Sequence, residues 1–238
     1  MKTNRAEIDG ALTDEIKQNK NAASEVKIED PVLEEALRRA LQIGPASLIT
    51  KEELRKLRSL RVEGTVRTLR GLEYAENLSE ILLNGALVDD LSPLYQMELE
   101  KNVGKDKCQL RLLRVKLENH QAQDVSFLEK IPDESGIQIY LYGQGPAVEK
   151  AFEKYCSYES VSFVKNYGDC VIYGECMLPW LFFEDGTISY TSDNEEVIKV
   201  WGPFFGESVE VKVGDCTGST VITARAGDCV KRICVTVK

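Results

Sequence analysis

The sequence is poor in histidine and has no long apolar run. Its 238 residues include one histidine, His120. One histidine cannot build a His-rich metal site, and no Gly-x-Ser-x-Gly, His-Glu-x-x-His or P-loop pattern accompanies it. The chain also lacks the ~18 consecutive apolar residues that a transmembrane helix needs. We therefore expect no enzyme, no catalytic residues, no metal or other cofactor, and no direct insertion into a membrane.

The chain also has fewer basic than acidic residues. The chain has 30 Lys and Arg against 39 Asp and Glu, a formal net charge of −9. A nucleic-acid-binding domain is usually basic, with Lys and Arg gathered on one face. The one basic cluster, between Arg55 and Arg70, is interpreted as a solvated face. We expect no nucleic-acid partner.

Residues 1–25 are polar and lack the apolar segment of a secretory signal peptide. They show no strong apolar stripe, so they are predicted to form a flexible polar arm.

The seven cysteines contain no Cys-x-x-Cys pair, which argues against a zinc site. Small buried thiols and one or more disulfides are both compatible with the sequence. A hairpin that turns at about Ala226-Gly227 would place Ser219 opposite Cys234. Cys216 would then lie near the end of the same strand pair, so Cys216–Cys234 is the candidate disulfide.

Two short helices are predicted after the arm. Asp30 is a good N-cap, Pro31 follows at the first helical position, and leucines recur behind it at helical spacing. Thr50 and Glu53 have the spacing of a capping box.

A repeating pattern follows this helical segment. Its strand-like parts are Leu78-x-x-Ile81-x-Leu83, Leu112-x-x-Val115-x-Leu117 and Ile137-x-Ile139-x-Leu141. Periods of about 20–29 residues with this pattern are typical of leucine-rich repeats, in which stacked units bury a shared ladder of leucines. Amphipathic helices are the alternative. We expect three to four repeats and a closing helix over 146–155, so that this unit spans 26–157.

The runs Leu69-Arg70-Gly71-Leu72 and Asp89-Asp90-Leu91-Ser92-Pro93-Leu94 resemble those of internalin-type leucine-rich-repeat proteins of Gram-positive bacteria. That resemblance implies a helical cap followed by 22-residue repeats. The insertion at 98–109 interrupts the pattern, and the short array implies only a small binding face.

Residues 158–238 change to seven short strand candidates separated by turns, which is typical of a β-sandwich. The runs Tyr190-Thr191-Ser192-Asp193, Gly218-Ser219-Thr220-Val221-Ile222-Thr223-Ala224 and Val235-Thr236-Val237 are similar to those of bacterial immunoglobulin-like group 2 domains. The resemblance implies a secreted or wall-bound protein in which the domain is a spacer or an adhesive module. It also implies an extracellular or cell-surface location, with a signal sequence already removed.

Four aromatic residues are candidates for ligand binding: Trp201, Phe204 and Phe205 in a Gly/Pro loop, and Trp180 in a second aromatic run. Aromatics exposed in such a loop resemble binding hot spots. The alternative is that they pack in the interior, where large aromatics are usually found.

The predicted fold is therefore α+β and multi-domain: a short leucine-rich-repeat solenoid with a helical N-cap, then an all-β immunoglobulin-like sandwich. The predicted function is non-enzymatic adhesion at the bacterial surface, with a protein or glycan partner. A structural spacer and an accessory part of a secreted hydrolase are the alternatives. The oligomeric state is left open.

Overall fold

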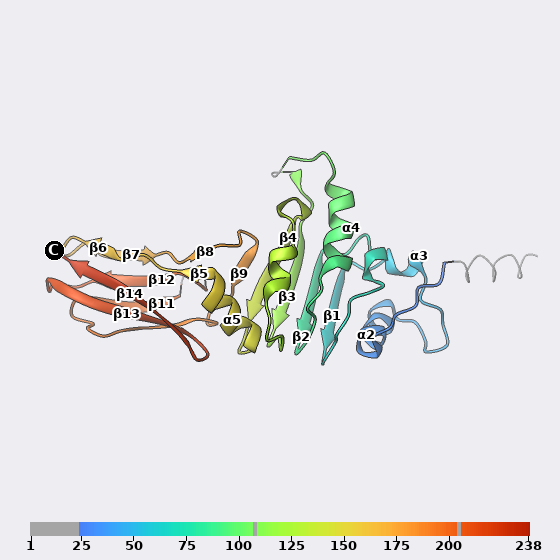
Figure 1. Ribbon diagram of the computed structural model, residues 1–238, viewed down its shortest axis with the longest axis horizontal. Helices are drawn as coiled ribbons and strands as arrows, with labels where there is room; N and C mark the ends of the chain where they lie inside the picture. The colour runs from blue at the N-terminus through green and yellow to red at the C-terminus, as the bar shows by residue number, and fades with distance from the viewer. Residues whose placement is uncertain (1–23, 107–108, 204–205) are drawn as a thin grey trace, which may run out of the picture.

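The computed structural model of the protein describes residues 24–106, 109–203 and 206–238. The fold is mixed, with most of its regular structure in several β-sheets and only a few helices. The chain is elongated: a helical cap lies at one end, a parallel sheet in the middle and two mainly antiparallel sheets at the other end (Figure 1). Nearly all of the predicted polar arm lies outside the described residues.

Asp30 organises the helical cap. Its Oδ1 accepts hydrogen bonds from the backbone N–H groups of Val32 (2.9 Å) and Leu33 (3.2 Å), at the start of helix α2 (Pro31–Leu41). Its Oδ2 accepts from the N–H of Arg67 at 2.7 Å. The predicted N-cap is confirmed, and the same carboxylate also ties the helix to the loop that follows the first strand. Thr50 caps α3 (Lys51–Leu54) as predicted.

The central sheet is parallel throughout and has the strand order β1-β2-β3-β4-β9. Along each strand buried apolar residues alternate with residues that face outward, as the pleat of a strand requires. The apolar residues of neighbouring strands are in register and form one continuous core. The strands are β1 (Ser59–Glu63), β2 (Glu80–Asn84), β3 (Leu113–Glu118), β4 (Ile137–Tyr142) and β9 (Leu181–Phe183).

Short helical segments return the chain from each strand to the next. They are η1 (Leu72–Tyr74), α4 (Ser92–Asn102), η3 (Ser126–Lys130) and η4 (Asp133–Ser135). The segment Ser92-Pro93-Leu94 forms the first turn of α4, because Pro93 is well suited to a helix start. The first part of the predicted insertion, up to Asn102, therefore forms helix.

Helix α5 (Pro146–Tyr155) has the bounds of the predicted closing helix. It buries Val148, Ala151 and Phe152 against the end of the parallel sheet. The chain then enters β5 (Cys156–Ser157), which pairs with β8 (Glu175–Cys176).

The C-terminal region contains two further sheets that share a core of valines and isoleucines. The seven predicted strands all occur. One sheet has the order β10-β13-β14-β6 and the other β11-β12-β7. Their strands are β6 (Val161–Phe163), β7 (Gly168–Ile172), β10 (Ser189–Ser192), β11 (Ile198–Pro203), β12 (Val209–Val213), β13 (Gly218–Ala226) and β14 (Cys229–Val237).

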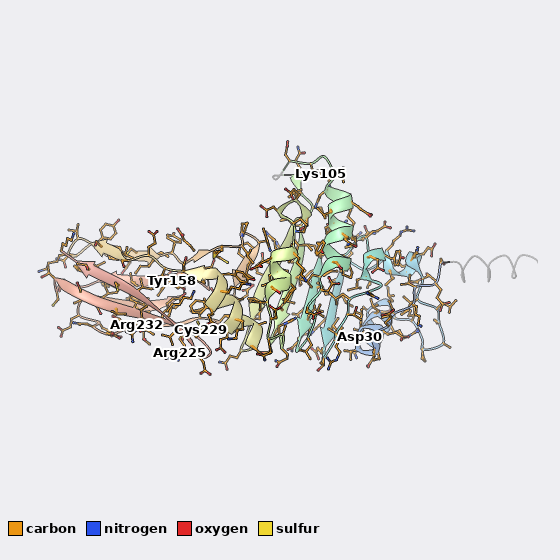
Figure 2. The ribbon with its side chains drawn as sticks, viewed as in Figure 1. Asp30, Lys105, Tyr158, Arg225, Cys229 and Arg232 are labelled. Carbon is orange, nitrogen blue, oxygen red and sulfur yellow. The ribbon has the colours of Figure 1, made fainter. Side chains whose placement is uncertain are left out.

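The two parts of the molecule are joined by more than one covalent connection. Strand β9 follows β7 and β8 in the chain but pairs with β4 of the parallel sheet. Ala224 and Ala226 of β13 belong to the same buried cluster as α5. Asp30 and Tyr158 lie toward opposite ends of the parallel sheet (Figure 2).

The predicted Cys216–Cys234 disulfide rested on a register that the structure corrects. The hairpin turns at Gly227-Asp228, so Cys234 faces Val221 and Ser219 faces Thr236. Moving the centre of the turn by one residue shifts every cross-strand pair by two. Cys216 lies before the first residue of β13, far along the strand from Val221, and both thiols are free and exposed.

Candidate functional site

The outer face of the parallel sheet changes character from one edge to the other. In its middle row Arg61, Leu82, Lys116, Tyr140 and Phe182 lie side by side on successive strands. The row thus runs from a charged residue at the edge near the cap to two aromatic residues next to the C-terminal sheets. These side chains point outward because every second residue of each strand faces the core.

Charges at the first edge neutralise one another. Arg61 forms an ion pair with Glu63 at 2.7 Å, and Lys116 lies 3.4 Å from Glu80. This part of the face therefore offers a ligand few uncompensated charges.

The aromatic end is built from neighbouring strands. The rings of Tyr140 and Phe182 stack with centroids 5.1 Å apart and an angle of 22° between their planes. Tyr142 lies two residues further along β4 on the same face. Partial burial raises the pKa of Tyr142, and the nearby charge of Glu184, with which its side chain forms a hydrogen bond, raises it further. Tyr142 thus keeps its phenol proton at neutral pH.

A hollow of about 420 Å³ opens beside these rings. We call it the aromatic hollow. In the part of the chain that the structure describes, its lining includes three acidic side chains and no basic one. Its side-chain lining consists mainly of Tyr140, Tyr173, Phe182, Glu184, Asp185, Glu207 and Ser208.

Glu207 is the most unusual residue of the aromatic hollow. Its Oε2 is buried and has no hydrogen-bond partner. Burial raises the pKa of this carboxyl group, although hydrogen bonds from its own backbone N–H and that of Phe183 oppose the shift. A buried acceptor without a hydrogen-bond partner costs free energy. A hydrogen-bond donor on a ligand would remove this cost.

Trp201, one of the residues predicted to bind, is 61% exposed. The pairing of β11 with β12 slips between Val200 and Gly202, so Trp201 occupies a β-bulge. Bulges redirect side chains and often lie next to functional sites. Lys199 lies over the indole ring at 5.5 Å. A second hollow, of about 380 Å³, lies between Trp201, Cys170 and Glu210.

Trp180, another of the predicted residues, does not join Trp201 in one exposed platform. Trp180 is half-buried and packs against the core of the parallel sheet, which agrees with the packing alternative. Its carbonyl accepts a hydrogen bond from the N–H of Ile139 at 2.7 Å, just before β9 begins. Phe204 and Phe205 lie outside the described residues.

Sequence reasoning missed Tyr140, Tyr142 and Phe182. The alternation Ile137-x-Ile139-x-Leu141 already directs Tyr140 and Tyr142 to the opposite face of their strand. Phe182 lies beside Tyr140 only because β9 joins the parallel sheet, and no local sequence pattern predicts that pairing.

Over residues 24–106, 109–203 and 206–238, no group of three or more His, Cys, Asp or Glu side chains is placed to hold a metal ion. No helix among the described elements is long and apolar enough to cross a membrane.

Comparison with protein families gives one match, to the NOG1 N-terminal helical domain over residues 23–131. This is less than half of the chain. The matched segment contains the parallel strands β1, β2 and β3, which do not belong in a helical domain, so the match does not establish the family. A search of curated proteins finds no relative.

Solved structures show only weak similarity. The CBM51-2 and INT domains of Clostridium perfringens ZmpB match with a TM-score of 0.30 and 16% identity over 90% of this chain and 36% of that one. An internalin, inlF, of Listeria monocytogenes matches with a TM-score of 0.31 and 20% identity over 66% of this chain and 52% of that one. Domains 4–9 of the surface layer protein SbsC match with a TM-score of 0.29 and 22% identity over 36% of this chain and 14% of that one.

The chain therefore spans about a third of the length of the ZmpB fragment that it matches. The matched proteins are, by their descriptions, surface-layer, internalin and carbohydrate-binding proteins. All three TM-scores are too low to establish a shared fold.

Proposed function

We propose that this protein is a non-enzymatic binding protein of the bacterial cell surface. Its ligand, a glycan or a protein, docks on the aromatic end of the parallel sheet. In this proposal the parallel sheet is a short leucine-rich-repeat solenoid and the two C-terminal sheets form an immunoglobulin-like domain. The regular in-register ladder of buried leucines, isoleucines and valines supports the first assignment, and the shared valine-rich core of the two sheets supports the second.

The aromatic hollow carries the proposal. Stacked Tyr140 and Phe182 form one wall and exposed Tyr173 contributes another ring. Aromatic rings offer large apolar contact with little conformational entropy to lose, which is why they dominate binding hot spots. A hollow of about 420 Å³ falls within the ~300–1,000 Å³ range of small-ligand sites.

The polar groups of the aromatic hollow indicate which chemical groups a ligand needs. Glu184, Asp185 and Glu207 are acceptors when ionised. Sugar hydroxyls and the amino or guanidinium groups of a protein are donors that satisfy them. An anionic ligand would meet uncompensated negative charge, so we expect neutral or cationic ligand groups.

The test is binding of the full chain to a glycan array and, in parallel, to immobilised mucosal extract. We expect a Tyr140→Ala/Phe182→Ala variant to lose at least about tenfold in affinity, since two hot-spot rings are removed. Arg61→Ala is the matched control because it lies in the same row at the opposite edge, and it should bind like the wild type.

Trp201→Ala assays the second hollow in the same experiment. Loss of binding in this variant alone would indicate that the binding site lies at the bulge of β11 and not on the parallel sheet. Equal binding by all variants, or no ligand in either assay, would contradict the proposal.

A structural spacer is the second candidate, favoured by one observation. The buried cluster of the parallel sheet continues through α5 into β13, so the two parts meet across a packed interface rather than a linker. Such a rod suits a module that holds another domain away from the cell wall. This function needs no ligand, and unaltered binding behaviour in every variant would favour it.

A further inference from the structure

Cys156 and Cys176, whose thiols are both free in the structure, lie directly opposite each other where β5 pairs with β8. The neighbouring N–H of Met177 donates a hydrogen bond to the carbonyl of Tyr155 at 2.9 Å. In an antiparallel ladder this bond marks the two cysteines as a non-hydrogen-bonded pair, whose Cα atoms are about 4.5 Å apart and whose side chains approach most closely. Disulfides join Cα atoms about 4.4–6.8 Å apart, so the backbone already has a suitable spacing.

No other described cysteine pairs with a cysteine in the strand registers. Cys170 faces Val211, Cys229 faces Ala226 and Cys234 faces Val221. All three partners are aliphatic, so these positions offer no cross-strand bridge. The register therefore selects one pair.

We infer that Cys156 and Cys176 form a disulfide when the protein folds in an oxidising medium containing a small-molecule disulfide such as glutathione disulfide. The two thiols lose two protons and two electrons as the new S–S bond forms. Glutathione disulfide takes them up and is cleaved to two glutathione thiols. The occurrence of this bond in the cell rests on the proposed extracellular location, because cytosolic thiols are kept reduced. Its formation in vitro does not.

The bridge has a clear structural consequence. It closes the segment 156–176, which contains β6 and β7, and so fastens the end of α5 to the chain that leads into β9. A crosslink of this kind stabilises mainly by restricting the unfolded chain. It would hold the two parts of the molecule together at the point where the chain passes between them.

Burial decides when the bond forms. Cys156 is only 2% exposed, and burial raises the pKa of its thiol to about 12. Burial also raises the pKa of Cys176. Because the thiolate is the reactive form, the folded protein oxidises slowly, and the bond forms while the chain is still folding. Once formed, it is shielded from reducing agents.

The first test is peptide mapping of the full chain refolded with reduced and oxidised glutathione. Trypsin cuts after Lys154 and a Glu-specific protease cuts after Glu159 and Glu175, which separates Cys176 from Cys170. The expected product is a disulfide-linked pair of peptides, 155–159 and 176–184. Free thiols at both positions, or a dominant linkage to another cysteine, would overturn the inference.

The second test compares melting temperatures of oxidised and reduced protein. The oxidised wild type should melt about 5–10 °C higher. Cys176→Ser should show no such difference, and the exposed Cys216→Ser control should keep it in full. Comparing the two redox states of each variant cancels any packing effect of the substitution. A difference that survives in Cys176→Ser would contradict the assignment, and neither test depends on ligand binding at the aromatic hollow.

Discussion

At the scale of single residues, His120 shows how burial sets an ionisation state. The side chain is fully buried, its Nδ1 accepts a hydrogen bond from the N–H of Ala122 at 3.3 Å, and its ring lies 5.8 Å from that of Phe127. Burial lowers its pKa from 6.5 to about 4, while the Val88 carbonyl and the charge of Asp89 oppose the shift less strongly. The residue is therefore neutral in the folded protein at physiological pH and acts in packing.

This burial predicts a pH dependence of stability. The unfolded chain binds the proton at about pH 6.5, whereas the folded chain binds it only near pH 4. The contribution of neutral His120 is thus complete above pH 6.5 and is lost as the pH falls toward 4. Between pH 7.5 and 5 the wild type should lose about 2 kcal/mol more unfolding free energy than His120→Gln. Urea unfolding at both pH values measures this, and equal losses would show that His120 is not responsible.

At the scale of elements, α4 is held by its last residue. Asn102 is buried, and its amide nitrogen donates to the carbonyls of Arg111 (3.1 Å) and Ser135 (2.9 Å). Its Oδ1 accepts from the N–H of Arg111 at 2.8 Å. One side chain thus fastens the end of the helix to the segments that lead into β3 and β4.

Removing this side chain should destabilise the region. Asn102→Ala leaves the buried Ser135 carbonyl and the Arg111 N–H without their partner, so we expect a loss of about 2–4 kcal/mol. Glu100→Ala, exposed on the same helix, should change stability by less than about 0.5 kcal/mol. Chemical denaturation of both variants makes the comparison. Similar small effects in the two would mean that α4 is not anchored through Asn102.

At the scale of the whole molecule, the contacts between its two parts decide whether it behaves as one body. Lys231 of β14 donates hydrogen bonds to the carbonyls of Glu153 (3.0 Å) and Cys156, at the end of α5. Its ammonium group also lies 5.3 Å from the centre of the Phe152 ring. A cation at a helix C-terminus is favourable for the helix dipole as well. Within the C-terminal part, Tyr158 forms a hydrogen bond with Tyr190, with 2.8 Å between the hydroxyl oxygens.

We predict a single unfolding transition that far-UV circular dichroism and tryptophan fluorescence report alike, because the buried cluster crosses the junction. Lys231→Ala should lower the unfolding free energy by about 1–3 kcal/mol. Arg232→Ala removes the same charge from the exposed neighbouring position and should have little effect. Two separate transitions in the wild type, or equal losses in both variants, would contradict a coupled junction.

Periodicity and turn residues predicted most of the strands and α5, and residue types predicted the caps at Asp30 and Thr50. These features depend on residues close together in the sequence. The strands β5, β8 and β9 were not predicted. The alternation in β4 also predicts that Tyr140 and Tyr142 face outward, although the predicted binding residues were Trp201, Phe204, Phe205 and Trp180. The domain boundaries at 26, 157 and 158 stay a prediction.

Only the tertiary structure decided which segments meet. The pairing of β9 with β4 brings Phe182 to Tyr140, and the pairing of β5 with β8 sets Cys156 against Cys176. A one-residue error in the position of one turn was enough to misplace Cys234. Local patterns determine what each segment becomes, whereas register and distant pairing follow from how all the apolar faces are buried together.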